Sequence, residues 1–344
     1  MKKRFSYRHG YWSDVLDTGI EFGSFSDLVA KLKAESVFVI TDCRVFTHYE
    51  NTLSKYPHWC LPEGEQAKTV DVVFQLYEHL LMENIDRNTI LIGVGGGVVT
   101  DVTGFVASTY KRGMPFILVP TSLLAMTDAA IGGKNGINFH GYKNMIGCIN
   151  QPALTYTDPV FLHTLTEEHY YNGLTEMLKT AFVLDESLLS DIENNVDAIH
   201  RRDEVILNSL LQKASRDKLK IVEADVSDKG IRHVLNFGHT LGHAVEMHDM
   251  ILHGYAVAKG MAAALRMSVD KGYLSALDYA RCDKVMKALK LPASFKMHDN
   301  LMLYIEKDKK RRQEKLDFVF LSAPGKALVE AVDLNELKKL MYAS

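Results

Sequence analysis

The sequence predicts an α/β domain built on a parallel sheet, residues 1–158, followed by a mostly α-helical domain, residues 159–344. A chain of 344 residues exceeds the usual single-domain size. In its first part, short β-rich apolar runs alternate with stretches of helical periodicity, an order typical of parallel strands joined by crossover helices. After Asp158 and Pro159 long helical stretches replace this alternation. We therefore expect the domain boundary at Asp158–Pro159.

Individual elements follow from local periodicity. In the first domain the predicted buried strands are 36–41, 89–94, 115–120 and 153–157, and the predicted amphipathic helix is 70–85. In the second domain the predicted helical stretches are 167–199, 203–224 and 253–273, followed by a hairpin at 317–332. Asp333 and Glu336, in capping-box spacing, open a last helix.

Composition excludes several classes of protein. Hydrophobic residues make up 47% and charged residues 24%, as in ordinary globular chains, and the net charge of -3 favours no binding to nucleic acid. The N-terminal basic residues precede no apolar run, so we expect no signal peptide, and no segment predicts a membrane span. The four cysteines are scattered without a framework spacing, which favours the reducing cytoplasm.

Three consecutive glycines, Gly95, Gly96 and Gly97, follow the strand at 89–94 and precede a predicted helix. Glycines at such a turn let the backbone approach a pyrophosphate, and the free N–H groups of the helix meet its charge. A tight packing turn is the alternative, since the GxGxxG fingerprint is absent. Asp42, at the end of the strand at 36–41, is placed to bind an adenosine ribose, so we favour a dinucleotide-binding, Rossmann-like domain.

Four histidines, His239, His243, His248 and His253, lie within residues 235–254. Imidazole is the commonest metal ligand, although a single histidine on an apolar face more often has a structural role. His239 and His243, four apart, face one side of a helix but lack the glutamate of the HExxH motif. A site with two histidines and one carboxylate would take its carboxylate from elsewhere, and Glu176 is available for that role.

Cationic and amide side chains gather in several motifs where apolar packing does not require them. They are Lys134, Lys143, Asn144, Arg112, Lys218, Arg232 and the Asp-Lys-Lys run at 308–310. Each alone is typical of a solvated surface. In a chain of near-neutral net charge, the set indicates a pocket for a small substrate that carries phosphate or carboxylate.

The motifs GGGVVTD, YKRG, PTSLLAMTDAAIGGKNGIN, YKNMIG, GLTEMLK and LNFGHTLGHAVE, in this order, closely resemble those of the 3-dehydroquinate synthase family of sugar phosphate cyclases. The resemblance runs from about residue 36 to the end. It implies an NAD-binding α/β domain, a helical metal-binding domain, and conversion of 3-deoxy-D-arabino-heptulosonate 7-phosphate to 3-dehydroquinate and phosphate. The implied steps are transient oxidation by NAD, β-elimination of phosphate, re-reduction and an intramolecular aldol closure.

The resemblance also implies roles for individual residues. It implies zinc, with cobalt as the alternative, bound by Glu176, His239 and His253, while His243 faces the substrate phosphate. Asp128 and Lys179 would lie beside the substrate hydroxyls, and Lys218 with Arg232 would bind the carboxylate. The residues implied to meet the phosphate are Lys134, Asn144, Asn236, His243 and Lys310, with Arg112 reaching across the interface of a homodimer. The residues expected to bind NAD are Asp42, Glu63, Gly64, Glu65, Gln66, Lys68, Gly95, Gly96, Gly97, Val98, Val99, Asp101, Thr121, Ser122, Lys134, Lys143, Phe161, Leu162 and Thr164.

The chain departs from the family's usual residues at Thr100, Ser122, Tyr255, Val226 and Asp228. Three other readings stay open. Another sugar phosphate cyclase would not need the carboxylate clamp of Lys218 and Arg232. A metal-dependent polyol dehydrogenase would not need so many cations. A structural zinc protein would close its site with four protein ligands.

Overall fold

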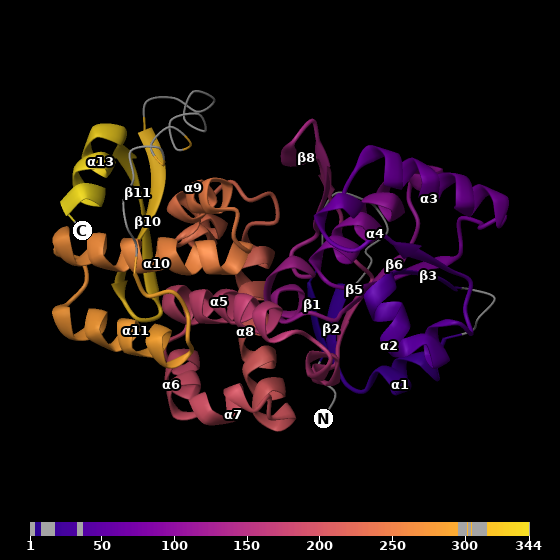
Figure 1. The fold of residues 1–344 in the computed structure, drawn as a ribbon, viewed down its shortest axis with the longest axis horizontal. Coiled ribbons are helices and arrows are strands. Elements are labelled where there is room, and N and C mark those ends of the chain that lie inside the picture. Colours follow the sequence, from indigo (N-terminus) through magenta and orange to yellow (C-terminus); the bar gives the residue numbers. More distant parts are fainter. Residues whose placement is uncertain are drawn as a thin grey trace. The chain divides into compact units, whose positions relative to one another are not determined.

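The computed structural model describes residues 4–7, 18–32, 37–294, 301, 304 and 315–343. The chain folds as two compact units, Met1–Thr166 and Glu167–Ser344, drawn in Figure 1. Asp158, where the sequence predicts the boundary, caps a short 3₁₀ helix, η5 (Pro159–His163), that belongs to the first unit. Among the described residues, no helix combines the length and apolarity needed to cross a bilayer.

The first unit is built on a seven-stranded sheet in the order β1-β2-β9-β6-β5-β3-β4. The bounds of the strands are β1 Arg4–Tyr7, β2 Thr18–Phe22, β3 Val37–Asp42, β4 His58–Leu61, β5 Ile90–Gly95, β6 Phe116–Pro120 and β9 Leu154–Thr157. Every neighbouring pair is parallel except β1 with β2. The parallel sheet and the four strands predicted in this part are confirmed as β3, β5, β6 and β9.

Helices connect the parallel strands of the first unit. They are α1 Phe25–Val29, α2 Cys43–Leu53, α3 Val70–Met82 and α4 Gly97–Thr109, with the short turns η2 Glu65–Ala67, η3 Tyr110–Arg112 and η4 Ala125–Ala129. The helix predicted at 70–85 is confirmed as α3, whose buried residues Val73, Leu76 and Leu80 share one face. An antiparallel hairpin of β7 (Lys134–Phe139) and β8 (Tyr142–Ile149) forms a separate sheet that the sequence did not predict.

The second unit is mostly helical, as predicted. Its helices are α5 Glu167–Leu184, α6 Glu186–Asn194, α7 Val196–His200, α8 Glu204–Ala224, η6 Ile231–Asn236, α9 His239–Asp249, α10 His253–Asp270, α11 Ala276–Ala288 and α13 Leu334–Ala343. The predicted hairpin is confirmed as β10 (Lys315–Ala323) and β11 (Lys326–Asp333). The stretch 167–199 is not one helix, because Asp185 accepts from the Ser187 amide and starts α6.

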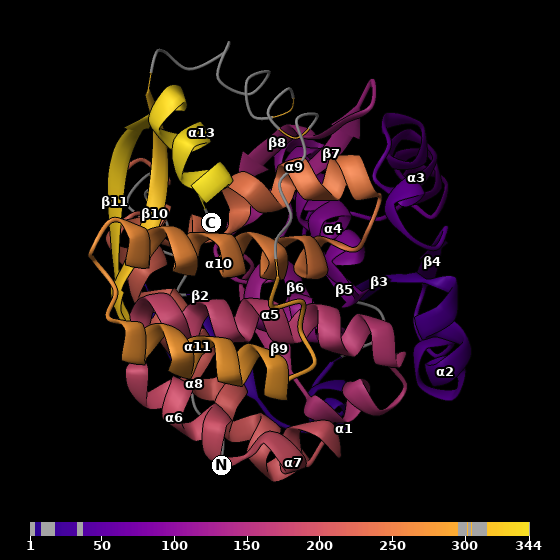
Figure 2. The ribbon, with the colours of Figure 1, turned by 60° about the vertical axis from the view of Figure 1, so that its left-hand side comes forward.

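The histidine-rich stretch at 235–254 is divided between two helices. Gly238, at a φ of 77°, precedes α9, and Met250, at 55°, ends it in the left-handed region. The chain then reverses, so that α10 packs along α9 and lies between α9 and α5 in both ribbon views (Figure 2). A Cβ on Gly260 would come within 2.0 Å of the Gly238 carbonyl oxygen, so glycine is needed for this close approach. The reversal brings His253, at the start of α10, close to His239, at the start of α9.

Candidate metal and cofactor sites

Glu176, His239 and His253 come together inside the second unit from three different helices. Glu176 lies on α5 and is 1% exposed, while His239 and His253 are the first residues of α9 and α10. The Nε2 atoms of both histidines lie 3.7 Å from Oε1 of Glu176. The ligand atoms of the three residues all lie within 4.8 Å of one another. The two imidazole rings are 5.3 Å apart between centroids.

This donor set fits a small divalent cation. A tetrahedral zinc ion with bonds of about 2.0–2.1 Å separates neighbouring ligand atoms by roughly 3.4 Å, close to the observed 3.7 Å. The described residues give the buried oxygens of Glu176 no hydrogen bond, although Lys179 forms an ion pair with one of them. A buried carboxylate is stabilised by nearby cations, and a metal ion would add to the charge of Lys179. Three protein ligands leave one tetrahedral position for an exogenous oxygen, as in catalytic rather than structural zinc sites.

Each metal-facing histidine has an acceptor for its other ring nitrogen. Nδ1 of His239 lies 3.3 Å from the Phe237 carbonyl oxygen, and Nδ1 of His253 lies 2.9 Å from Oε2 of Glu246. Such bonds place the proton on Nδ1 and leave Nε2 free for a metal. Sequence reasoning missed Glu246. The signal was present, because His239, His243 and Glu246 are spaced four and then three residues apart and share one face of α9.

The electrostatics of this cluster favour the metal-binding protonation states of Glu176 and His239, which are the ionised carboxylate and the neutral ring. They oppose the neutral ring of His253. Burial works to raise the pKa of Glu176, but Lys179 and the two imidazoles hold it well below its ordinary value. Burial, with the charge of Lys179, lowers the pKa of His239 well below its ordinary value. Burial also lowers that of His253, but the neighbouring carboxylates of Glu176 and Glu246 favour the protonated ring, outweigh burial and raise the pKa to about 9. A metal ion would therefore displace a proton from His253.

The other predicted residues of the second unit divide into buried cations and exposed polar groups. Lys179, Lys218 and Arg232 are all at most 4% exposed. Arg232 donates to the Val226 carbonyl, 3.4 Å away. Asn236 and His243 are exposed. The ring of His243 lies 5.4 Å from that of His239, beside the metal-ligand cluster.

In the first unit, most of the residues expected to bind NAD lie at or just beyond the carboxyl ends of the strands, and Lys134 and Lys143 are the exceptions. Asp42 ends β3, residues 63–68 follow β4, Gly95 ends β5 and residues 96–101 follow it, Thr121 and Ser122 follow β6, and residues 161–164 follow β9. Because these strands are parallel neighbours, their carboxyl ends form one edge of the sheet. That edge is where open parallel sheets bind nucleotides.

The glycine run allows close packing and leaves the start of α4 without a side-chain cap. A Cβ on Gly95 would lie 2.4 Å from Val99, so this glycine lets α4 pack closely on its own strand. Gly96 is less crowded, with its nearest neighbour, the Ser122 hydroxyl oxygen, at 3.4 Å. It occupies the N-cap of α4 without a side-chain cap. The first amides of the helix thus lack a side-chain acceptor from this position, as an anion site requires.

A lysine joins two of the predicted residue sets in the first unit. Lys68 Nζ donates to Asp101 Oδ2 at 2.6 Å and to Asn144 Oδ1 at 2.5 Å. Asp101 belongs to the expected NAD set and Asn144 to the expected phosphate set. Burial raises the pKa of Asp101 to about 6 against the opposing effect of Lys68. Because Lys68 holds the amide oxygen, the amide N–H₂ of Asn144 is directed elsewhere and is available to an anion.

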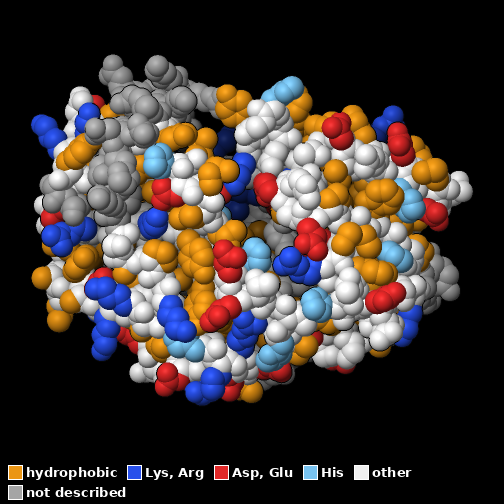
Figure 3. All heavy atoms as spheres, in the orientation of Figure 1, with side chains coloured by type: hydrophobic (Ala, Val, Ile, Leu, Met, Phe, Trp, Pro, Cys, Tyr) orange, Lys and Arg blue, Asp and Glu red, His pale blue; other side chains and the backbone are white. Residues whose placement is uncertain are grey.

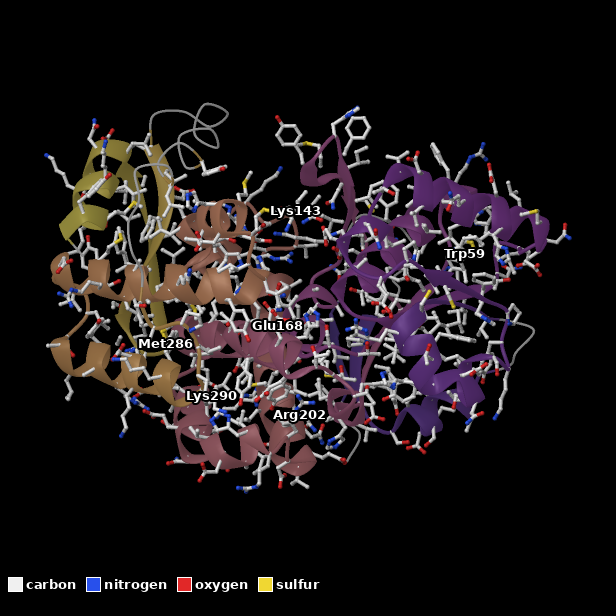
Figure 4. All side chains as sticks on the ribbon, viewed as in Figure 1. Trp59, Lys143, Glu168, Arg202, Met286 and Lys290 are labelled. Atoms are coloured by element: carbon white, nitrogen blue, oxygen red, sulfur yellow. The ribbon has the colours of Figure 1, made fainter. Side chains whose placement is uncertain are left out.

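Some predicted residues have other contacts. Phe161 and Leu162 are buried, and the Phe161 ring packs 4.8 Å from Tyr49, so these two side chains belong to the core. Asp42 accepts from the Val45 amide and caps α2. Asp128 lies in η4, close enough to Asp101 to help raise the pKa of that carboxyl. Lys134 and Lys143 are exposed on the hairpin, where Figure 4 labels Lys143.

The departures from the family pattern have ordinary local partners. Thr100 is buried and donates to the Gly97 carbonyl, and Ser122 accepts from the Ala125 amide. The Tyr255 hydroxyl donates to the carbonyl of Glu168, labelled in Figure 4, in the first turn of α5. Tyr255 is therefore directed away from the His253 ring. Lys310 and the rest of its Asp-Lys-Lys run lie outside the described residues.

A nucleotide-type parallel sheet, together with a helical unit that carries an open His-His-Glu cluster, defines a class of enzymes that use both a nucleotide cofactor and a metal ion. Comparison with known proteins narrows that class. The family described as 3-dehydroquinate synthase N-terminal matches residues 58–172, and 3-dehydroquinate synthase C-terminal matches residues 173–311. The 3-dehydroquinate synthase of Clostridium tetani is 35% identical over 96% of this chain and 91% of its own length. The chain belongs to the 3-dehydroquinate synthase family.

Solved structures of other cyclases share the fold. The 2-epi-5-epi-valiolone synthase of Streptomyces hygroscopicus, with NAD⁺ and Zn²⁺ bound, is 28% identical over 98% of this chain and 99% of that one, with a TM-score of 0.85. A 2-deoxy-scyllo-inosose synthase, complexed with carbaglucose-6-phosphate, NAD⁺ and Co²⁺, is 21% identical over the full length of both chains, with a TM-score of 0.86. The latter likeness establishes the fold alone.

Proposed function

We propose that this enzyme converts 3-deoxy-D-arabino-heptulosonate 7-phosphate to 3-dehydroquinate and phosphate, using NAD and a divalent metal ion, zinc by preference. The observation that carries the proposal is the open Glu176, His239 and His253 cluster in a chain of this family. A structural zinc site would need a fourth protein ligand. The edge of the parallel sheet, with the uncapped start of α4 after Gly96, supports NAD binding in the first unit.

When bound, NAD would supply a reversible hydride acceptor, and a metal ion held by Glu176, His239 and His253 would supply a Lewis acid. The protein's own residues bind and orient the substrate. Lys179, buried beside Glu176, would hold a proton at a substrate hydroxyl close to the three proposed metal ligands. His243, exposed beside the cluster, would meet the phosphate with Asn236. The leaving phosphate can itself accept a proton, so we assign no protein base.

The choice of a carboxylated substrate rests on Lys218 and Arg232. Both side chains are buried cations of the same unit. The planar guanidinium of Arg232 suits a substrate carboxylate because it offers paired donors. A cyclase for an uncharged sugar phosphate has no need of these two groups. This favours the heptulosonate phosphate over the substrates of other cyclases.

The direct test is turnover of this substrate. Full-length enzyme with zinc and NAD at a small fraction of the substrate concentration should release inorganic phosphate over many turnovers, with 3-dehydroquinate as the carbon product. Omission of zinc after chelation should stop phosphate release. Absence of phosphate release from the fully loaded enzyme would contradict the proposed function.

We also propose that the enzyme is a homodimer in which Arg112 reaches the partner's active site. The β7–β8 hairpin supports this, because it exposes five large apolar side chains: Phe139, Tyr142, Met145, Ile146 and Ile149. Figure 3 shows hydrophobic side chains at the projecting tip of the hairpin, near the top of the view. Apolar clusters of this kind mark interaction surfaces.

We expect a dimer mass in solution by light scattering, and a shift toward monomer when Met145 and Ile146 are both replaced by aspartate. The Arg112→Ala variant should remain dimeric, and inorganic phosphate should inhibit its turnover less strongly than that of the wild type. A monomeric wild-type protein at micromolar concentration would contradict the dimer.

For localisation we propose the cytoplasm, where a reducing environment suits the four unpaired cysteines, and we expect no nucleic-acid or membrane partner.

A further inference from the structure

Glu246 is a carboxylate that the motif resemblance assigns to no substrate, cofactor or metal, yet it contacts a metal ligand. Its Oε2 lies 2.9 Å from Nδ1 of His253, and its side chain is largely buried. We propose that Glu246 is a positioning residue that fixes the ring orientation and tautomer of His253, and thereby sets the affinity of the site for its metal ion. The inference rests on the proposed metal site.

The geometry of the imidazole gives Glu246 this role. His253 presents Nε2 toward Glu176, at 3.7 Å, and Nδ1 toward Glu246. An ionised carboxylate accepts hydrogen bonds and does not donate them, so the proton is held on Nδ1. The Nε2 lone pair is then directed at the metal position. A carboxylate behind a ligating histidine also raises the basicity of the ring.

His253 needs such support more than His239 does. The acceptor for His239 is the Phe237 carbonyl, a backbone group that comes with the local chain path. His253, by contrast, is the first residue of α10, directly after the turn at Met250, and Leu252 at the N-cap provides no side-chain cap. The backbone there is held by Asn172 of α5, whose Oδ1 accepts from the Gly254 amide at 2.7 Å. Asn172 thus fixes the backbone and leaves ring rotation to Glu246.

Two alternatives are distinguishable. Tyr255, two residues after His253, is not the orienting group, because its hydroxyl donates to the Glu168 carbonyl. Glu246 could instead be a ligand, since His243, Glu246 and His253 form a second group whose ligand atoms lie within 4.8 Å of one another. A metal there would compete for Nδ1 of His253, the atom that donates to Glu246. Metal affinity of matched variants separates the two roles.

The test measures zinc dissociation constants by competition with a chromogenic chelator, starting from metal-free full-length protein. Glu246→Gln keeps an acceptor oxygen without its charge, whereas Glu246→Ala removes both. We expect zinc affinity to fall about tenfold for the glutamine variant and about a hundredfold for the alanine variant. Asp249→Asn is the matched control: Asp249, near the end of the same helix, pairs with His248 and Lys259. It should keep zinc affinity within about threefold.

Three results would decide against the inference or its basis. If both Glu246 variants bind zinc within threefold of wild type, Glu246 does not position His253. If Glu246→Gln loses zinc as completely as Glu176→Gln, Glu246 is a ligand and the inference is wrong. If Glu176→Gln binds zinc normally, the proposed metal site itself fails. Unfolding midpoints of the metal-free proteins should agree between wild type and Glu246→Gln, and only the rise in midpoint on adding zinc should shrink.

Discussion

Replacing His253 by alanine should remove the metal ion and lower kcat by at least about a thousandfold, because two remaining ligands cannot hold zinc against dilution. The side chain lies at the start of α10 and is partly exposed, so its loss should leave the fold intact. The measurements are zinc content of the purified protein by atomic emission and the rate of phosphate release. NAD binding, which we propose for the first unit, should be unchanged by calorimetry.

The matched control is His248→Ala, another histidine of the same region, which pairs with Asp249 at the end of α9. That variant should retain one zinc per chain and near-normal turnover. Full metal content in the purified His253→Ala protein would remove His253 from the ligand set.

Replacing Arg232 by methionine should lower kcat/KM for the heptulosonate phosphate by about a hundredfold, equivalent to about 3 kcal/mol of lost binding in the transition state. Arg232 is 4% exposed, and methionine fills much of its volume without charge. Inhibition by inorganic phosphate should persist, because the groups expected to bind phosphate are different residues.

Lys220→Met is the control for this change. It removes a cation of the same unit that is 64% exposed and paired with Asp217. Its kinetics should match wild type. Unchanged kinetics in Arg232→Met would remove the carboxylate clamp and favour another sugar phosphate cyclase.

Much of the architecture was readable from the sequence because it depends on local pattern. The strand at 89–94 is a short apolar run and the helix at 70–85 has a helical period, and the structure has both. The β7–β8 hairpin was missed because most residues of β8 are exposed, so no apolar alternation marks the strand. The sequence did offer a signal in the turn, because Gly141 is a residue type that favours the positive φ of tight hairpin turns. In the structure His140 and Gly141 both have positive φ.

The metal cluster shows where spacing alone fails. His239 and His243 share one side of α9, and helical periodicity by itself would pair them on one metal ion. The structure instead places His253 beside Glu176 and His239, because the turn at Met250 reverses the chain and α10 packs along α9. That reversal depends on tertiary packing around Gly238 and Gly260, which no local pattern encodes. The motif resemblance supplied the ligand set that spacing could not.

The sequence could place Glu246 on the same face of α9 as His239 and His243, but it could not show which side chains Lys68 and Glu246 contact. Lys68 and Asn144 are 76 residues apart, and nothing in either motif indicates that their side chains meet. Glu246 and His253 are only seven apart, but on opposite sides of a helix break. Periodicity identifies a shared face within one helix and cannot say which side chains face each other across a turn.

The fate of the hydride tests the central claim most directly. A cyclase that returns its hydride leaves NAD unchanged after each cycle, whereas a polyol dehydrogenase releases its ketone and leaves one NADH per turnover. The measurement records absorbance at the NADH band and inorganic phosphate together, with zinc-loaded enzyme, catalytic NAD and the heptulosonate phosphate. We expect phosphate to rise over many turnovers while NADH absorbance stays near its starting value. Accumulation of NADH in step with substrate consumed, without phosphate release, would contradict the account.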